Sequence, residues 1–223
     1  MAAHLVHPYP LPAGDSEHLM IARFLIARHA QPTKDEQDLT DLGRDQAAAT
    51  ADAHLREYTY FDSLAWSGMA RTQRTLIGGL LSRCSRMDGM HEESELGYKN
   101  SFFDPDIPAR LKSPTIDANA AKALYDAHGM SAVYRFRLLS FMERTIREHF
   151  LDKHVPAQAR DITCLWVSHG GVIESIVNPD ISKVPVIGHA DILRVEWVVQ
   201  GLNGQITYRM STTEILRCPI RTP

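Results

Sequence analysis

Short apolar runs of strand length alternate along this chain with longer segments in which apolar residues recur at helical spacing. The predicted strands cover residues 20–27, 61–66, 161–167, 192–199 and 205–210, and a weaker pattern places a short strand at 87–91. The last two runs flank Gly201-Leu202-Asn203-Gly204, a sequence typical of a hairpin turn.

The segments between these runs predict helices, which cover residues 39–57, 70–81, 119–128, 131–153 and 170–177. Thr40 or Asp41 is suited to cap the first of them. Because strands and helices alternate, we expect an α/β fold with a mainly parallel central sheet and helices on both faces.

One domain accounts for most of the chain. Residues 1–19 hold three prolines without periodicity and are expected to form an N-terminal arm. The domain then covers 20–217, with a loop-rich insertion around 92–118, and a C-terminal tail follows at 218–223. An irregular stretch as long as this insertion usually forms a lid or a binding loop.

Composition and charge argue against several classes of function. The chain has 223 residues, 44% of them hydrophobic, and a formal net charge of −3. Charge so close to balance gives no overall attraction to nucleic acid or to a membrane surface. No apolar stretch is long enough to cross a membrane, and the N-terminus lacks the pattern of a secretory signal, so we expect a cytoplasmic protein. The three cysteines have no metal-ligand spacing, and we expect neither disulfides nor a metal nor another cofactor.

Residues suited to phosphate chemistry follow several of the predicted strands. Arg28 and His29 end the first strand, and a neutral imidazole there is nucleophilic near pH 7. Ser67 follows the second strand, and Arg71 lies at the start of the next helix, where its guanidinium could grip phosphoryl oxygens. Taken alone, each of these residues also fits an ordinary hydrogen bond or a surface ion pair.

A third strand end repeats the arrangement with Ser168-His169-Gly170-Gly171, where Gly170 permits close approach of the backbone to a ligand. Glu92, Glu93 and Glu95 follow the weakly predicted strand, and one such carboxyl group could protonate a leaving oxygen. Because parallel strands bind ligands at their carboxyl ends, these residues are expected to share one pocket.

Together these elements resemble the histidine phosphatase superfamily, in the branch that includes cofactor-dependent phosphoglycerate mutases. The resemblance rests on four matching elements in the same order, which are Arg28-His29-Ala30, Leu39 to Ala47, Ser67 to Thr75, and Ser168 to Gly171. The family's acid-base Glu stands four residues before a Gly, which selects Glu93 relative to Gly97. The family commonly has a Leu two places before that Glu, where this chain has His91.

The resemblance implies roles for these residues. His29 would be the nucleophile that becomes phosphohistidine, Glu93 the proton donor, and His169 a third catalytic group. Arg28 and Arg71 would hold the phosphoryl oxygens, with Gly170 beside them. His189 falls where relatives often place a pocket residue, and a surface turn explains it equally well.

The function expected from this resemblance is metal-independent hydrolysis of a small phosphate monoester. A mutase is the first alternative, but residues 98–105 carry few of the cations that mutases use to hold a second phosphate. A non-catalytic phosphate-binding module and a metal-dependent hydrolase are the others. A homodimer is left open, and no nucleic-acid or membrane partner is expected.

Overall fold

A computed structural model describes residues 5–7, 18–82, 90–97, 129–151, 161–178, 180–202 and 205–221. Several sequence predictions fall outside these ranges. They are the helix at 119–128, most of the insertion around 92–118, the hairpin turn at 203–204 and Cys84.

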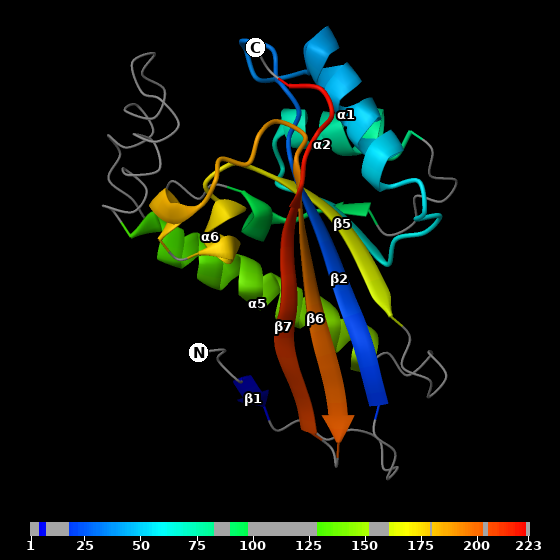
Figure 1. The fold of residues 1–223 in the computed structure, drawn as a ribbon, viewed down its shortest axis with the longest axis vertical. Coiled ribbons are helices and arrows are strands. Elements are labelled where there is room, and N and C mark those ends of the chain that lie inside the picture. The colour runs from blue at the N-terminus through cyan, green and yellow to red at the C-terminus, as the bar shows by residue number, and fades with distance from the viewer. Residues whose placement is uncertain are drawn as a thin grey trace.

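A seven-stranded sheet forms the centre of the molecule (Figure 1). Its strands are β1 (Leu5–His7), β2 (His18–Arg28), β3 (Ser63–Trp66), β4 (Met90–Glu92), β5 (Ile162–Ser168), β6 (Ile192–Leu202) and β7 (Gln205–Leu216). They are arranged in the order β1-β7-β6-β2-β5-β3-β4. Strands β2, β5, β3 and β4 are parallel, as predicted. On the other side of β2, the long hairpin β6–β7 and the short β1 pair antiparallel.

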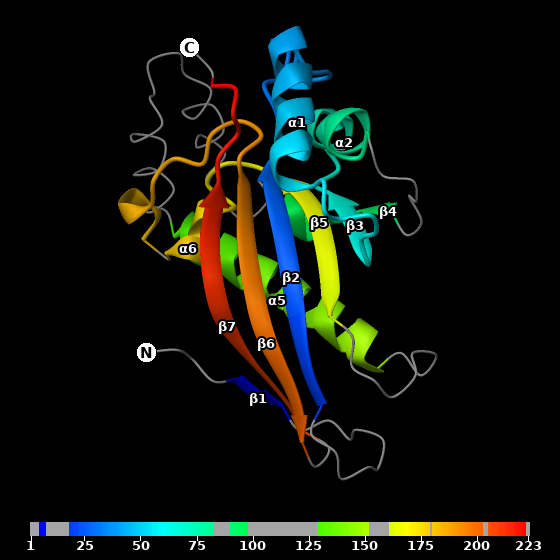
Figure 2. The ribbon, with the colours of Figure 1, turned by 45° about the vertical axis from the view of Figure 1, so that its right-hand side comes forward.

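Helices cover both faces of the sheet, which confirms the predicted α/β architecture (Figures 1 and 2). The helical elements are α1 (Asp41–His54), α2 (Ala70–Thr75), the π-helical turn η1 (Leu76–Leu80), α5 (Met130–Leu151), α6 (Glu174–Val177) and the short 3₁₀ turns η2 (Ser94–Leu96) and η4 (Ile181–Lys183). Among the described helices, none is long and apolar enough to cross a membrane.

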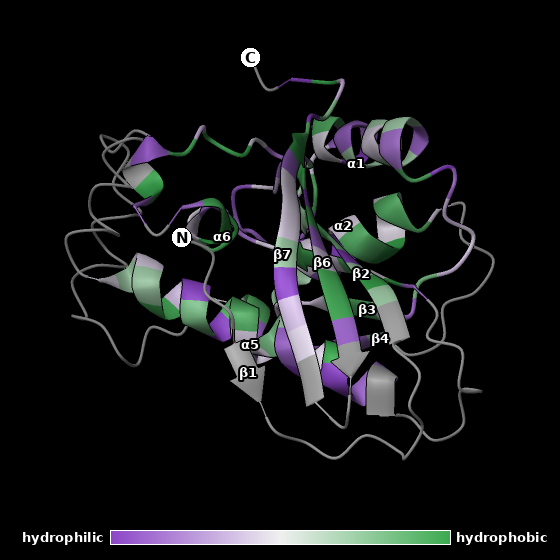
Figure 3. Ribbon diagram, turned by 60° about the horizontal axis from the view of Figure 1, so that its bottom comes forward, coloured by the Kyte–Doolittle hydropathy of each residue, from purple (hydrophilic) through white to green (hydrophobic). Residues whose placement is uncertain are grey.

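Each central strand is apolar on both faces because each face is covered. In β2, Phe24 and Ile26 face the α5–α6 layer, whereas Leu25 and Ala27 face the layer of α1 and η1. Trp166 of β5 is fully buried in the first layer. In Figure 3 the helices α1 and α5 carry both green and purple segments, as expected for helices with one face on the sheet and one in solvent.

Several predicted boundaries differ from the structure, most clearly at β1, β7 and α6. Residues 5–7, placed in the N-terminal arm, form edge strand β1 on β7. Strand β7 continues to Leu216, six residues beyond its predicted end at Met210, because it stays paired with β6. The predicted helix at 170–177 is helical only at Glu174–Val177. Gly171 has a φ of 82°, outside the helical region, so the first residues form a turn.

Candidate active site

The carboxyl ends of the parallel strands meet at one edge of the sheet, where the predicted site residues gather. Arg28 at the end of β2 lies opposite Ser168 of β5. Trp66 of β3 lies opposite Val167 of β5 on one side and Glu92 of β4 on the other. The residues that follow these strands are therefore neighbours in space, although the sequence separates them widely.

His29 is buried, with 7% of its surface exposed, and a hydrogen bond to the next residue orients its ring. Its Nδ1 lies 2.9 Å from the carbonyl oxygen of Ala30. A carbonyl can only accept, so Nδ1 carries the proton and Nε2 keeps the lone pair. The pKa of His29 lies well below 6.5 because the ring is buried, with smaller contributions from His169 and Arg28. The imidazole is thus neutral and nucleophilic through Nε2.

His169 lies edge-on to His29, with ring centroids 5.3 Å apart. Its Nε2 is 2.7 Å from the hydroxyl of Ser67, and its Nδ1 is 3.5 Å from Nη2 of Arg71. Because a guanidinium can only donate, Nδ1 accepts and Nε2–H donates to Ser67. The pKa of His169 is lowered well below 6.5 by burial and then by Arg71 and Arg28.

The Ser67 hydroxyl continues this chain of hydrogen bonds. It lies 3.1 Å from the Thr72 hydroxyl, which itself donates to the carbonyl of Met69 at 2.6 Å. Ser67 therefore accepts from His169 and donates to Thr72, so that every proton in the chain has an assigned place. The order holds the His169 ring in one orientation and one tautomer.

Arg28 extends from the end of β2 into the same region. Its Nη1 donates to the carbonyl of Ile187 at 2.6 Å, and its buried Nε has no hydrogen-bond partner among the residues that the structure describes. Gly170 leaves room for this guanidinium, since a Cβ there would lie 3.2 Å from Cζ of Arg28. We expected Gly170 to admit a ligand to the backbone, and in the structure it admits Arg28.

Arg71, in the first turn of α2, is 6% exposed. Its Nη1 donates to Oε2 of Glu36 at 2.5 Å, and within the described part of the chain its buried Nε has no hydrogen-bond partner. Glu36 belongs to none of the motifs matched in the sequence, so no sequence signal marks it as a partner of Arg71.

His189 also belongs to the cluster, with its ring centroid 5.6 Å from that of His29. It lies in a turn that Ala190 closes with a φ of 57°. The pKa of His189 is lowered to about 4, first by burial and then by Arg28, against a smaller opposite effect of Asp191. His189 is half-buried in this turn, and its ring lies beside that of His29, which favours a pocket residue over an isolated surface turn.

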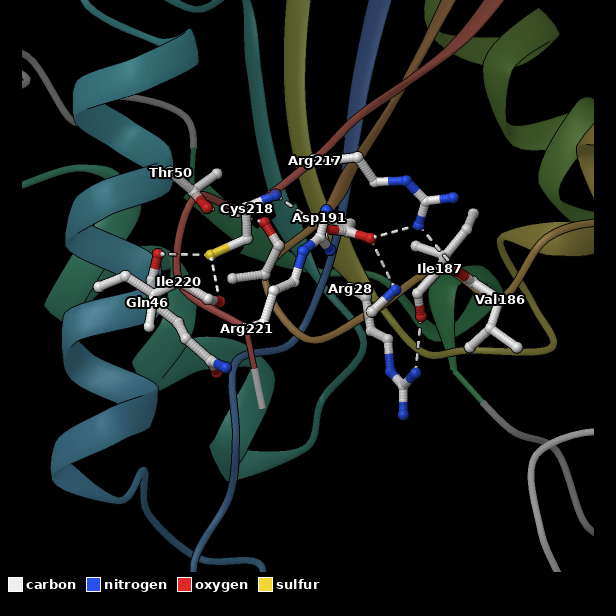
Figure 4. A network of polar contacts seen from close by, with 12 residues as sticks. Arg28, Gln46, Thr50, Val186, Ile187, Asp191, Arg217, Cys218, Ile220 and Arg221 are labelled. Atoms are coloured by element: carbon white, nitrogen blue, oxygen red, sulfur yellow. Dashed lines mark hydrogen bonds and ion pairs between the residues drawn. The ribbon is translucent and has the colours of Figure 1, made fainter. Parts of the chain in front are cut away.

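Asp191 holds this turn in place (Figure 4). Its side chain is fully buried and accepts four hydrogen bonds at 2.7–3.1 Å, from the main-chain N–H groups of Gly188 and Cys218 and the guanidinium groups of Arg217 and Arg221. Its carbonyl accepts from the main-chain N–H of Arg28 at 2.9 Å. Asp191 thus ties the end of β2 to the segment that follows β7.

The acidic candidates Glu92 and Glu93 have different neighbours in the structure. Glu93, selected by its spacing to Gly97, forms an ion pair with Arg144 of α5 at 2.6 Å and accepts from the main-chain N–H of Glu95. Glu92 ends β4, and its Oε1 would lie 2.5 Å from a Cβ placed on Gly68. The Glu92 carboxylate therefore packs against the turn that joins Ser67 to α2.

The arrangement suits transfer of a phosphoryl group. It contains an oriented neutral nucleophile, two arginines for anionic oxygens and acidic groups at the neighbouring strand end. The described residues contain no group of three or more His, Cys, Asp or Glu that could hold a metal ion.

Acidification is expected to lower the folding stability through the buried His29 and His169 and the half-buried His189. The pKa values of His29, His169 and His189 all lie below the unfolded value near 6.5. The unfolded chain therefore binds protons first, and stability that is fully present above pH 6.5 is lost as the pH falls below it. Each ring contributes up to about 1.4 kcal/mol per pH unit in that window. Urea unfolding at pH 7.5 and 5.5 measures the loss.

The His189→Asn variant serves as the control for this pH dependence, because it removes one of the three titrating rings. Its free energy of unfolding should fall less steeply with acidification. An unchanged or higher stability of the unaltered protein at pH 5.5 would contradict the protonation states given above.

No protein-family model and no curated protein matches the chain. Solved structures do match it. Phosphoglycerate mutase from Bacillus anthracis aligns with a TM-score of 0.54 at 14% identity, over 87% of this chain and 92% of the mutase chain. The mycobacterial glucosyl-3-phosphoglycerate phosphatase, in complex with inorganic phosphate, aligns with a TM-score of 0.50 at 17% identity, over 85% of this chain and 95% of that chain. These likenesses confirm the predicted phosphoglycerate mutase-like α/β fold.

Proposed function

We propose that this protein is a phosphomonoesterase that works through a phosphohistidine at His29. The observation that carries the proposal is the orientation of the His29 ring. Its Nδ1–H is bound to the Ala30 carbonyl, which leaves Nε2 unprotonated among the groups suited to bind phosphate. A buried imidazole kept neutral and aimed in this way is what attack on phosphorus requires.

In the first step Nε2 of His29 attacks phosphorus, and the ester oxygen leaves on the opposite side. Arg28 and Arg71 bind the phosphoryl oxygens and stabilise the charge of the transition state. A bound dianion raises the pKa of His169 and favours a proton on its Nδ1, which then donates to the phosphoryl group. Water cleaves the phosphohistidine in the second step and returns His29 to its neutral form.

Hydrolysis of an aryl phosphate with a chelator present tests the reaction class. The expected result is turnover that the chelator does not reduce, together with an acid-labile phosphate on His29 in rapidly quenched samples. Loss of activity on chelation would favour a metal-dependent hydrolase instead. Absence of turnover with retained phosphate binding would favour a non-catalytic module.

Mutase activity is assayed in parallel because the chain shares the fold of a phosphoglycerate mutase. Incubation with a bisphosphoglycerate and a monophosphoglycerate distinguishes the two reactions. A phosphatase releases inorganic phosphate, whereas a mutase interconverts the monophosphates.

The proton donor is expected to be Glu93 by its spacing, whereas the packing of Glu92 against Gly68 favours Glu92. The variants Glu92→Gln and Glu93→Gln form a matched pair that decides between them. The variant without the donor should lose roughly 10²–10⁴-fold in kcat for an alkyl phosphate, whose leaving oxygen needs a proton. It should lose much less for a nitrophenyl phosphate, whose leaving group does not.

The other member of the pair should keep kcat within a few-fold of the unaltered protein. If both variants retain full activity on the alkyl phosphate, neither carboxyl group donates the proton.

A further inference from the structure

The loop between β2 and α1 is closed by its own hydrogen bonds. Pro32 and Leu39 form an isolated bridge, and the main-chain N–H of Thr33 donates to the carbonyl of Asp38 at 2.9 Å. The Thr33 hydroxyl also donates to the side chain of Asp35 at 2.5 Å. Such a loop presents its tip in one conformation.

Glu36 lies at this tip in the left-handed region, with a φ of 59°. Its N–H donates to the carbonyl of Thr33 at 2.9 Å, which closes the turn. Glycine adopts this conformation without strain, whereas glutamate rarely does. Strained positions of this kind concentrate at functional sites. A glutamate retained where glycine would be less strained points to a role for its side chain.

The side chain of Glu36 reaches the centre of the proposed site. Its carboxylate contacts Nη1 of Arg71 at 2.5 Å. The Arg71 side chain is 7% exposed and the Glu36 side chain 46%, so the carboxylate approaches the guanidinium from the solvent side. On its inner side the same guanidinium faces His169 through Nη2.

We propose that Glu36 is a specificity-determining residue that selects phosphate monoesters by the charge of their leaving group. The inference rests on the proposed function and names its substrate class. The favoured monoesters carry an ammonium or another hydrogen-bond donor near the ester oxygen. Monoesters with a second anion at that place, such as phosphoglycerates, are disfavoured.

The position of the Glu36 carboxylate explains this preference for the charge of the leaving group. A phosphoryl group that His29 attacks lies among the buried groups, so its leaving group extends away from His29 toward solvent. Glu36 stands on the solvent side of Arg71 and already satisfies one of its donors. A second anion would meet a negative charge there and would find that donor occupied, whereas a cation would meet an opposite charge.

The experiment compares two probes of similar size, O-phosphoethanolamine and 3-phosphoglycerate. The ratio of their kcat/KM values is measured for the unaltered protein and for Glu36→Gln. Removal of the charge should lower the ratio of the ammonium probe to the carboxylate probe by roughly tenfold, a modest effect because the site is partly open to solvent. Asp41→Asn is the matched control, since this substitution also removes one negative charge and the Asp41 side chain is 99% exposed. Its ratio should stay within about twofold of the original.

Binding of inorganic phosphate gives a second readout that does not depend on turnover. In calorimetry, Glu36→Gln should bind phosphate roughly tenfold more tightly, because the carboxylate no longer competes for Arg71. Glu36→Gly should also bind phosphate more tightly, because it removes the same carboxylate.

The possible failures are distinguishable. An unaltered protein that hydrolyses neither probe nor an aryl phosphate refutes the proposed function, whereas phosphate binding by the variants still tests Glu36. Unchanged probe ratios and unchanged phosphate affinity in both Glu36 variants would overturn the role of Glu36 while leaving the phosphatase proposal intact.

Discussion

Replacement of His29 by alanine is expected to abolish phosphatase activity, with a loss of at least about a thousandfold in kcat/KM. Alanine removes the imidazole nitrogen that the proposed mechanism assigns to attack on phosphorus, and the guanidinium groups of Arg28 and Arg71 cannot act as nucleophiles. Hydrolysis of an aryl phosphate in the presence of a chelator measures the loss. Mass spectrometry of quenched samples should find no phosphohistidine in the variant.

The matched control for this variant is His149→Ala. His149 lies on α5, where its Nδ1 donates to the carbonyl of Thr145, and no described contact links it to the site. This variant should keep full activity. Turnover by the His29 variant equal to that of the unaltered protein would remove the proposed nucleophile, and with it the covalent mechanism.

The second large effect is expected for Asp191→Ala, which should lower the free energy of unfolding by about 3 kcal/mol. The buried carboxylate accepts four hydrogen bonds, two of them from main-chain N–H groups of Gly188 and Cys218. Without it these N–H groups lose their partners inside the protein. Arg217 and Arg221 lose less, because they are 36% and 56% exposed and can turn to water. Urea denaturation measures the difference.

Glu214→Ala provides the comparison for an ion pair near the surface. Its partner Arg194 lies 2.6 Å away, but the Glu214 side chain is 48% exposed. The expected loss is less than about 1 kcal/mol. If both variants lose equally little, the buried network of Asp191 does not stabilise the fold as described.

The parallel strands and their functional ends could be predicted because the signal is local. A run such as Phe24 to Ala27 is apolar without alternation, which indicates burial on both faces, and the polar residues after it mark the strand end. The topology then brings Arg28, His29 and His169 together without any information beyond strand order and direction.

The remaining features depend on contacts between distant residues. Glu174 lies within the helix predicted at 170–177, and its carboxylate accepts from the main-chain N–H groups of Gly171 and Ile187. These hydrogen bonds favour a turn at residues 170–173, where the sequence predicts the start of the helix. The contact of Glu36 with Arg71 likewise depends on a left-handed residue, and no spacing rule marks that position as functional.

Pairing with β6 also explains why β7 is longer than predicted, since the polar end of β7 gives only a weak strand signal. Residues such as Thr212 and Thr213 would suit a loop, yet pairing with β6 keeps them in the sheet. A strand of this kind is defined by its neighbour more than by its own apolar pattern.

The two edges of the described sheet differ in how readily another strand could add to them. Strand β1 pairs with residues 206–208 of β7, so residues 209–216 have no partner on that side among the described strands. An open border of this length invites a foreign strand to add to it. The irregularity opposite Glu196 and Trp197 interrupts a continuous ladder, and the exposed charged side chains of Arg209 and Glu214 make this edge less apolar. At the other border β4 is only three residues long, too short to nucleate fibrils.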